Sequence, residues 1–321
     1  MKLNGLAGEF VNGLELSGFR LGRPKKFVFL CGGVLDRTNA KPPETAREAF
    51  LRQLPNRQLF HDYNIILAEE INAFYPDSPY SHTNLIDLEK DIAEISDSVV
   101  LFSEGIGSLA ELGAFTQIAE IAQRMIVIIQ ETHHNAKSFV RDGPIRKLEQ
   151  LRKDSVLVFD WKVDTRIEPF LDHSSFMQIY SDLSNSVLGQ LQILPEKETI
   201  VQSSFAHRTF LVCALIDVCG ALKLEEISFF LTTLGLTVSN SELKRILFCA
   251  EKVGWINLRK YGNTKYYFPN FHASVCDFKY NARANHKDVV RWKVDLLKFW
   301  NDTDRSRSKL ISENFRREQI S

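Results

Sequence analysis

Short apolar runs alternate with amphipathic stretches through the first half of the chain. The apolar runs, which predict buried strands, lie at 27–31, 64–67, 98–103, 125–130 and 155–159. Between them, apolar residues recur at helical spacing over 84–96, and further helices are predicted over 108–123 and from Gly143-Pro144 onward. This alternation predicts an α/β domain with a parallel sheet, whose ligand sits beyond the carboxyl ends of the strands.

The pattern changes at Pro195–Thr199, where we expect a linker. Helices are predicted over 207–219 and 224–234, and Ser239–Glu242 caps a third. Two alternating segments then flank Tyr261-Gly262-Asn263, which predicts a hairpin over 255–268. Three helices and a basic hairpin are the order of a winged helix-turn-helix. A last amphipathic helix carries Trp292, Leu296 and Phe299 before a frayed end. We therefore expect an α/β domain over 1–195 and a mainly helical domain over 205–321.

Charge separates the two halves. The chain has 321 residues, with 40 basic and 40 acidic side chains, and its formal net charge is zero. Residues 1–205 hold 21 basic and 28 acidic residues, whereas residues 206–321 hold 19 and 12. The basic half is therefore a candidate for binding a polyanion, and Lys244, Arg245, Arg259, Lys260 and Lys265 would lie on its third helix and hairpin. Protein contact by the same scaffold remains an alternative.

Several classes of protein are disfavoured by the residues. Five cysteines without a CxxC pair indicate reduced core thiols and a cytoplasmic protein. His133-His134 is read as a solvated loop, so no metal site is expected. The chain has neither G-x-G-x-x-G nor a Walker A motif, and no cofactor is expected. The N-terminus has no signal-peptide pattern, and no apolar run approaches the ~20 residues that span a bilayer.

One segment raises a question of chemistry. Ser108-Leu-Ala-Glu111 fits a capping box, in which the two side chains satisfy backbone N–H groups. Gly105 and Gly107 precede it, and Gly113 stands inside the helix at a cost of ~1 kcal/mol against alanine. A helix N-terminus favours an ionised carboxylate, and such a group beside a glycine-lined cleft suits attack on an anomeric carbon. The residues alone leave capping and catalysis about even.

The same region resembles the nucleoside deoxyribosyltransferase family, whose nucleophilic glutamate stands in an E-L-G stretch after a small-residue loop. A wider set of motifs resembles the toxin-type effectors of bacterial retrons, in which such a domain precedes a winged-helix-like region. The motifs are Phe29-Leu-Cys-Gly-Gly33, Phe74-Tyr-Pro76, Ile95–Glu104, Gly107-Ser108, Glu111-Leu-Gly-Ala-Phe115 and Gly143-Pro-Ile-Arg146. They cover the first half of the chain; the second half is similar only in architecture.

The resemblance implies a Rossmann-like parallel-sheet fold and roles for individual residues. Glu111 matches the nucleophile, and Glu89 stands where the transferases have an aspartate that protonates the base. The substrate-binding candidates are Gly32, Gly33, Tyr75, Glu104, Gly107 and Ser108. Each has a structural alternative: an exposed helix face for Glu89, a solvated loop for Glu104, a strand-ending turn for the two glycines, and packing for Tyr75. Asp97 is read as structural.

The function that the resemblance implies is an N-glycosidase toxin acting on a nucleotide or NAD. It would be held inactive by a retron reverse transcriptase and its msDNA, a DNA–RNA molecule, and would form a homo-oligomer or larger complex. The alternative is a non-catalytic regulator that senses a nucleotide and binds DNA, because the transferases' loop aspartate is replaced by Glu104.

Overall fold

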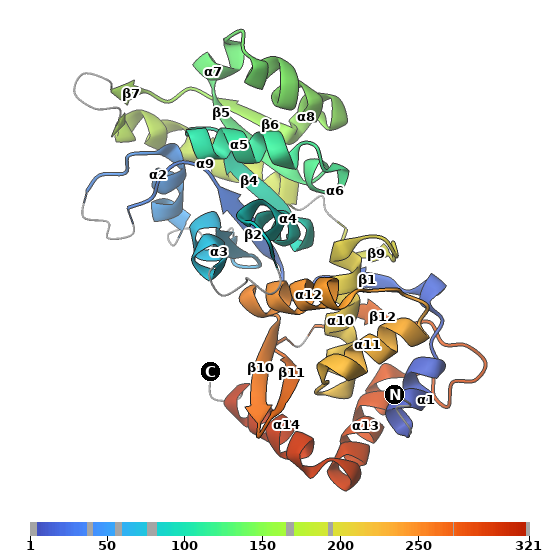
Figure 1. Ribbon diagram of the computed structural model, residues 1–321. Helices are drawn as coiled ribbons and strands as arrows, with labels where there is room; N and C mark the ends of the chain where they lie inside the picture. The colour runs from blue at the N-terminus through green and yellow to red at the C-terminus, as the bar shows by residue number, and fades with distance from the viewer. Residues whose placement is uncertain are drawn as a thin grey trace. The chain divides into compact units, whose positions relative to one another are not determined.

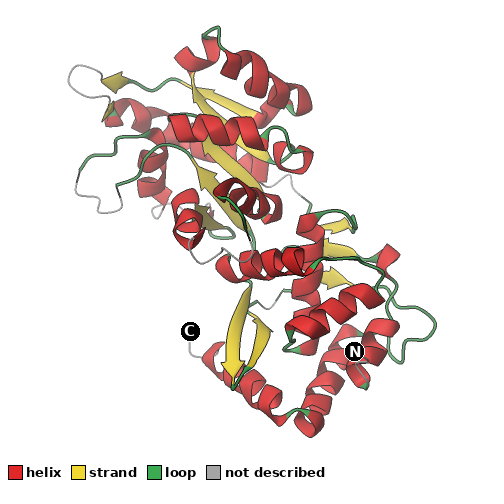
Figure 2. Ribbon diagram, in the orientation of Figure 1, coloured by secondary structure: helices red, strands yellow, loops and turns green. Residues whose placement is uncertain are grey.

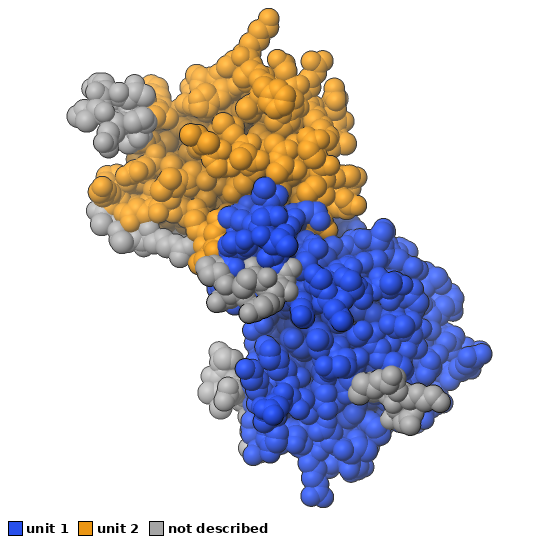
Figure 3. Space-filling model, viewed as in Figure 1, with its two compact units in different colours: residues 1–25, 74–91, 195–321 blue, residues 26–73, 92–194 orange. Residues whose placement is uncertain are grey.

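The computed structural model describes residues 5–36, 41–54, 60–75, 82–164, 170–191, 195–271 and 273–318 (Figure 1). Its internal contacts divide the chain into two compact units (Figure 3). Unit 1 comprises Met1–Lys25, Phe74–Asp91 and Pro195–Ser321. Unit 2 comprises Lys26–Ala73 and Ile92–Leu194. The predicted boundary near residue 195 coincides with one crossing between units, but two earlier stretches of the chain also belong to unit 1.

Unit 2 is built on a five-stranded parallel sheet in the order β3-β2-β4-β5-β6 (Figure 2). The strands are β2 (Phe27–Cys31), β3 (Asn64–Leu67), β4 (Ser98–Phe102), β5 (Met125–Gln130) and β6 (Val156–Phe159). All of β2 and β4 is buried, which explains why these strands are continuous apolar runs. The parallel sheet predicted from the sequence is confirmed.

Helices cover both faces of this sheet. On one face, α2 (Ala46–Gln53) and α9 (His173–Leu191) share a buried cluster with the strands, which includes Phe50, Phe102 and Tyr180. On the other face, α5 (Ile106–Phe115) places the ring of Phe115 6.5 Å from that of Phe29. The remaining described helical elements are α3 (Ala68–Phe74), α6 (Ala119–Ala122), α7 (Glu131–Asn135), the π-helix η5 (Arg141–Ile145), α8 (Arg146–Leu151) and the 3₁₀ turn η6 (Lys153–Ser155). A short hairpin joins β7 (Val163–Asp164) and β8 (Phe170–Leu171).

Unit 1 interleaves the two ends of the chain. Strand β1 (Arg20–Gly22) lies between β9 (Lys197–Thr199) and β12 (Cys276–Asp277) in a three-stranded antiparallel sheet. Along the chain, β1 is preceded by α1 (Leu6–Asn12) and by a 3₁₀ turn, η1 (Leu16–Gly18). The ring of Phe10 on α1 lies 5.3 Å from that of Trp292, and Trp255 Nε1 donates to the Lys25 carbonyl. The N-terminal residues are therefore part of the core of unit 1.

The helical part of unit 1 follows β9. It comprises α10 (Phe205–Cys219), α11 (Leu224–Thr233), α12 (Asn240–Lys252), the hairpin of β10 (Ile256–Tyr261) and β11 (Thr264–Pro269), α13 (Val289–Thr303) and α14 (Arg305–Glu318). Ser239 caps α12 by accepting a bond from the Glu242 N–H, as predicted. Leu222, between α10 and α11, pairs with Tyr267 of β11. The predicted hairpin is confirmed, whereas the predicted frayed end is wrong, because α14 continues the tail to Glu318.

Helix α4 (Leu85–Ile95) is shared between the units, because Asp91 belongs to unit 1 and Ile92 to unit 2. Among the described residues, no helix combines the length and the apolar character that crossing a membrane requires. All five cysteines lie in described parts of the chain and are buried, free thiols, which agrees with the expected core thiols.

Candidate active site

The sheet of unit 2 reverses its winding direction between β2 and β4. The chain goes from β2 to β3 on one side, and then returns to form β4 on the other side of β2. The loops that leave the carboxyl ends of β2 and β4 therefore diverge, and open α/β sheets bind their ligands at this switch point. Gly32 and Gly33 follow β2, and Glu104 and Gly105 follow β4, so the structure brings these predicted residues to one edge of the sheet.

The two glycines after β2 are required by close packing within the protein. Gly32 has φ +152°, and a Cβ added there would lie 2.6 Å from Arg47 Cδ and 2.9 Å from Phe102 Cβ. A Cβ added at Gly33 would lie 2.8 Å from Thr45 Cγ2. The first turn of α2 thus occupies the space beside both glycines. The structure explains them as a packed turn, and contact with a substrate stays a prediction.

Glu104 is bound to the start of α2 and is not a solvated loop residue. Its Oε2 accepts the Ala46 N–H at 2.6 Å, and its Oε1 accepts the Arg47 N–H at 2.9 Å. Burial raises the pKa of Glu104, against the opposing effect of these two hydrogen bonds and of the Arg47 charge. The carboxylate therefore joins the loop after β4 to the N-terminal turn of α2, and both of its oxygens are engaged.

Arg47 lies at the same place and was not predicted from the sequence. Its side chain is 1% exposed and pairs with Glu69 at the start of α3, while its Nε has no hydrogen-bond partner among the described residues. An arginine in the first turn of a helix is normally a surface residue, so its sequence position offers no signal that it is buried at the switch point.

The helix that carries Glu111 starts two residues earlier than predicted. Helix α5 begins at Ile106 and ends at Phe115, and α6 is a separate short helix, so the single helix over 108–123 is wrong. Ser108 is the third residue of α5; its Oγ accepts the N–H groups of Glu104 at 3.2 Å and Gly105 at 3.0 Å, and donates to the Gly105 carbonyl. Gly105 is the N-cap and Ser108 binds its N–H from inside the helix, so the predicted capping box with Ser108 as the N-cap and Glu111 as its partner is wrong.

Glu111 instead lies in the second turn of α5 beside an open surface. It is half-buried, and its Oε2 is shielded from solvent. Gly107 is exposed, and Cβ atoms added at Gly105, Gly107 or Gly113 would meet no atom within 4 Å outside the local helix backbone. These three glycines, unlike Gly32 and Gly33, are not explained by packing. They leave space over the helix at the carboxyl edge of the sheet.

The other predicted catalytic and base-contacting residues belong to unit 1. Glu89, on α4, is buried, so the alternative of an exposed helix face is wrong. The Tyr75 hydroxyl donates to the Thr83 carbonyl at 3.1 Å, within the same stretch of chain. Asp97, in unit 2, accepts the Phe27 N–H at 2.8 Å and joins the starts of β2 and β4, which confirms its structural role.

The predicted nucleic-acid-binding residues differ in what they contact. Lys244 and Lys265 line a groove of about 630 Å³ between α11, α12 and the hairpin, together with Lys223, Glu225 and Glu251. Lys223 was missed because it lies at the start of α11, outside the third helix and hairpin. Lys260 is exposed and stands directly opposite Lys265 in the hairpin, and the Arg259 guanidinium lies 5.7 Å from the Phe268 ring.

Arg245 differs from these four because it is already bound. Its Nε donates to Asp91 Oδ2 at 2.7 Å, and its terminal nitrogen donates to Asp91 Oδ1 at 2.6 Å. This bidentate pair raises the pKa of Arg245. Arg245 is therefore a structural residue in this conformation, with its guanidinium directed at a carboxylate of the same unit.

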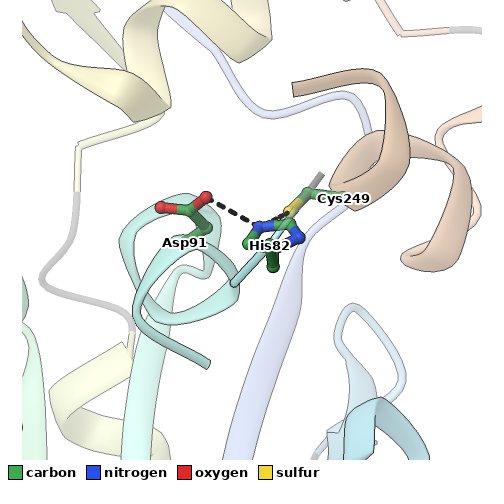
Figure 4. Close-up of side chains that lie close together, drawn as sticks. All are labelled: His82, Asp91 and Cys249. Carbon is green, nitrogen blue, oxygen red and sulfur yellow. Dashed lines mark hydrogen bonds and ion pairs between the residues drawn. The ribbon is translucent and has the colours of Figure 1, made fainter. Parts of the chain in front are cut away.

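Asp91 also lies close to His82 and Cys249, and all three side chains carry atoms that can bind a metal ion (Figure 4). His82 Nε2 lies 2.9 Å from Asp91 Oδ2 and 3.9 Å from Cys249 Sγ, and all three side chains are buried. Their types suit zinc, but Arg245 already balances the carboxylate, and a divalent cation would add buried positive charge. The residues are far apart in sequence, so no spacing motif reveals the cluster.

Comparison with known proteins relates this chain to retrons. A family model described as "STM3845 retron effector protein" matches residues 43–258. The chain is 29% identical over 226 residues to "Retron Ec73 putative ribosyltransferase/DNA-binding protein" of Escherichia coli, which covers 68% of this chain and 70% of that protein. It is 27% identical over 224 residues to the corresponding Escherichia coli protein named for retron Ec86, covering 69% and 70%. The family model spans both the Glu111 loop and α12, well over half of the chain, and the protein therefore belongs to the STM3845 retron effector protein family.

Proposed function

We propose that this protein is the toxin effector of a retron anti-phage system and that it cleaves the N-glycosidic bond of a nucleotide or of NAD, with Glu111 as the nucleophile. The observation that carries the proposal is the geometry of α5. Ser108 is not the N-cap that would pair with Glu111 in a capping box, and glycines that packing does not explain leave the helix open beside Glu111. The word "ribosyltransferase" in the names of both relatives supports chemistry at a sugar carbon.

The reaction would proceed in two displacements. A Glu111 carboxylate oxygen attacks the anomeric carbon, the bond to the base nitrogen breaks, and its electron pair leaves with the base. An acid gives that nitrogen a proton where the base requires one, and Glu89 is the proposed donor. Water then attacks the glycosyl ester, releases the sugar and restores the Glu111 carboxylate; a second base in place of water would complete a transfer.

The alternative function is a non-catalytic regulator that senses a nucleotide and binds DNA. It is favoured by the bonds that Glu104 makes to Ala46 and Arg47, because that carboxylate is then not available to the hydroxyls of a sugar. The two functions would use the same surface beside α5 and differ in whether Glu111 reacts.

The test is the release of base by the purified protein from NAD and from a panel of nucleotides. In Glu111→Gln, the amide keeps the volume but cannot form the glycosyl ester, so base release and host toxicity should fall by orders of magnitude while the melting temperature changes little. Glu120→Gln, on an exposed position of α6, removes the same charge from unit 2 and should change neither. A Glu111→Gln protein with full activity would remove the enzyme function and leave the regulator.

We further propose that unit 1 contains a winged helix that binds nucleic acid. The order of elements supports this fold: helix α10 is followed by Leu222, then by α11, α12 and the β10–β11 hairpin. Leu222 pairs with Tyr267 of β11, as a short first strand beside the hairpin would. Lys260 faces Lys265 across the hairpin, and like charges directly opposite destabilise a strand pair. Such a pair is expected where both lysines meet phosphates. The proposed natural partners are the retron reverse transcriptase and its msDNA, which would hold the toxin inactive in an oligomeric complex.

Replacing one of these lysines separates binding from hairpin stability. In Lys265→Glu, the pair with Lys260 becomes attractive while the new charge repels Glu251, so the stability of the hairpin should change little. Affinity for duplex DNA should fall, and the slope of log K against log salt should shrink by about one or more. Lys137→Glu, an exposed change in unit 2, is the control and should leave the slope unchanged. Equal DNA binding by both variants would assign the hairpin to protein contact.

A further inference from the structure

The stretch Phe74–Asp91, described at residues 74–75 and 82–91 and hereafter the 74–91 segment, packs on one side of α12. Its strongest contact is the bidentate pair between Arg245 and Asp91, whose carboxylate is 0% exposed. The same carboxylate accepts a bond from His82 Nε2–H at 2.9 Å. A buried carboxylate needs such partners, because without them its charge would be left in a medium that solvates it poorly.

Further contacts follow the same side of α12. The His82 ring lies 5.6 Å from the ring of Phe248, and its Nε2 lies 3.9 Å from Cys249 Sγ. The Lys252 ammonium lies 4.6 Å from the Phe74 ring. Positions 245, 248, 249 and 252 form one stripe of a helix, since they are three, four and seven residues apart. The 74–91 segment therefore covers a continuous stripe of α12.

The side of α12 next to this stripe is open, and Phe248 of the stripe also lines the groove there. Lys244 is exposed and lines the groove shared with Lys223 and Lys265. The consecutive residues Lys244 and Arg245 thus have different surroundings: the Lys244 side chain is exposed to solvent, whereas the Arg245 guanidinium is bound to Asp91. A polyanion that reaches Lys244 would come to the edge of the 74–91 segment and to Arg245.

We propose that the Arg245–Asp91 pair is a latch that holds the 74–91 segment on α12 and withholds Arg245 from nucleic acid, and that a bound phosphate backbone releases the segment. This inference rests on the proposed nucleic-acid binding of unit 1. A phosphate offers guanidinium the same two-oxygen acceptor as a carboxylate. Arg245 would then exchange one bidentate partner for another, and Asp91 would lose its main counter-charge.

Release follows from the burial of Asp91. A carboxylate that loses its guanidinium keeps His82 and, at 3.9 Å, the partly exposed Lys90 ammonium as partners. These replace a bidentate guanidinium poorly in a dry site, so residues 82–91 would leave α12 to hydrate Asp91. Seating of the segment and phosphate binding at Arg245 are then mutually exclusive, and each weakens the other by the same factor.

The experiment measures amide hydrogen exchange in the full chain together with affinity for a duplex DNA at several salt concentrations. In the wild type without DNA, the amides of residues 88–91, which have acceptors within α4, should be protected, and saturating DNA should speed their exchange at least tenfold because this end of α4 loses its packing. Asp91→Asn should show fast exchange without DNA, several-fold tighter DNA binding and a salt slope larger by about one, because Arg245 becomes available.

Two further variants distinguish release of Arg245 from a non-specific destabilisation of unit 1. Arg245→Met should also show fast exchange, but without the gain in DNA affinity, because the freed residue is absent. Asp302→Asn removes one negative charge from an exposed site of unit 1 and should match the wild type in both measurements. Should Asp91→Asn fail to fold, the wild-type exchange with and without DNA still decides the question.

Several outcomes would overturn the latch. Protected amides at residues 88–91 in the presence of saturating DNA would do so, as would an Asp91→Asn protein without a gain in affinity. If Lys265→Glu weakens DNA binding while Asp91→Asn gains nothing, nucleic-acid binding stands and only the latch fails. If no variant binds DNA, both fail. One equivalent of zinc per chain, lost in Cys249→Ser, would overturn it too, because a metal ion would then hold the segment.

Discussion

Glu104 and Glu111 are seven residues apart, and their surroundings indicate different roles for the two carboxylates. Glu104 uses both carboxylate oxygens to bind the first N–H groups of α2, which fixes the loop after β4. Glu111 stands one helical turn beyond the cap that Ser108 provides, beside glycines without packed neighbours. The sequence shows two glutamates among three glycines, and only the tertiary structure distinguishes the structural carboxylate from the candidate nucleophile.

The glycines give a residue-level prediction, because they divide into two kinds. Gly32→Ala places a Cβ against Arg47 and Phe102 at positive φ, and should lower the free energy of unfolding by about 1–3 kcal/mol. Gly107→Ala meets no neighbour in an exposed helical position, and should raise it by about 0.4–1 kcal/mol. Thermal melts measure both changes.

Base release is the second readout of the same pair. If Gly107 keeps the surface open for substrate, Gly107→Ala should lose activity while it gains stability. Any activity lost by Gly32→Ala should follow its loss of folded protein. A Gly107→Ala protein that is more stable and fully active would show that this glycine does not serve access to Glu111.

At the scale of elements, periodicity predicted which segments are helices better than it predicted which of their side chains are buried. The apolar residues of α4 recur at helical spacing, and the helix forms as expected. However, Glu89 and Asp91, which stand between the apolar positions, are buried, and Ile86 is 67% exposed. Asp91 is buried because Arg245, distant in sequence, supplies its counter-charge. A helical pattern reports spacing, and the partner that pairs a buried charge lies outside the pattern.

Helix ends were less predictable than helix positions. Ser108 carries the residue type of an N-cap, yet it acts from the third position of α5 and bonds backward to Glu104 and Gly105. A serine hydroxyl can accept from N–H groups ahead of it as an N-cap or from those behind it at the third helical position, so the S-x-x-E pattern does not determine the register of the helix. Ser239 was assigned correctly because its hydroxyl accepts the N–H three residues ahead, as the pattern requires.

At the scale of the whole molecule, unit 1 cannot be cut out at the predicted boundary. Strand β1 is the central strand between β9 and β12, and α1 contributes the buried Phe10. We expect a fragment of residues 205–321 to lack a cooperative unfolding transition, because it loses β1, β9 and α1 and exposes the apolar surface they cover. Circular dichroism and a thermal melt measure this.

Restoring the missing strands is the control for that fragment. A chain of residues 195–321 preceded by residues 5–25 through a flexible linker should regain a cooperative transition, because β1 again lies between its two partners. A sharp unfolding transition in residues 205–321 alone would contradict the prediction and show that this part of unit 1 folds without the N-terminal strand.

The sequence by itself determined the parallel sheet, its strands, the hairpin, the cap at Ser239 and the basic character of the second half. These features depend on local spacing and composition, because a buried strand must be apolar and a tight hairpin needs Gly262. The tertiary structure alone decided that residues 1–25 and 74–91 belong with the C-terminal unit, that Glu104 binds α2, and that Asp91 holds Arg245. Each of these depends on which distant group satisfies a strand edge, a helix N-terminus or a buried charge, and neighbouring residues along the chain do not specify that partner.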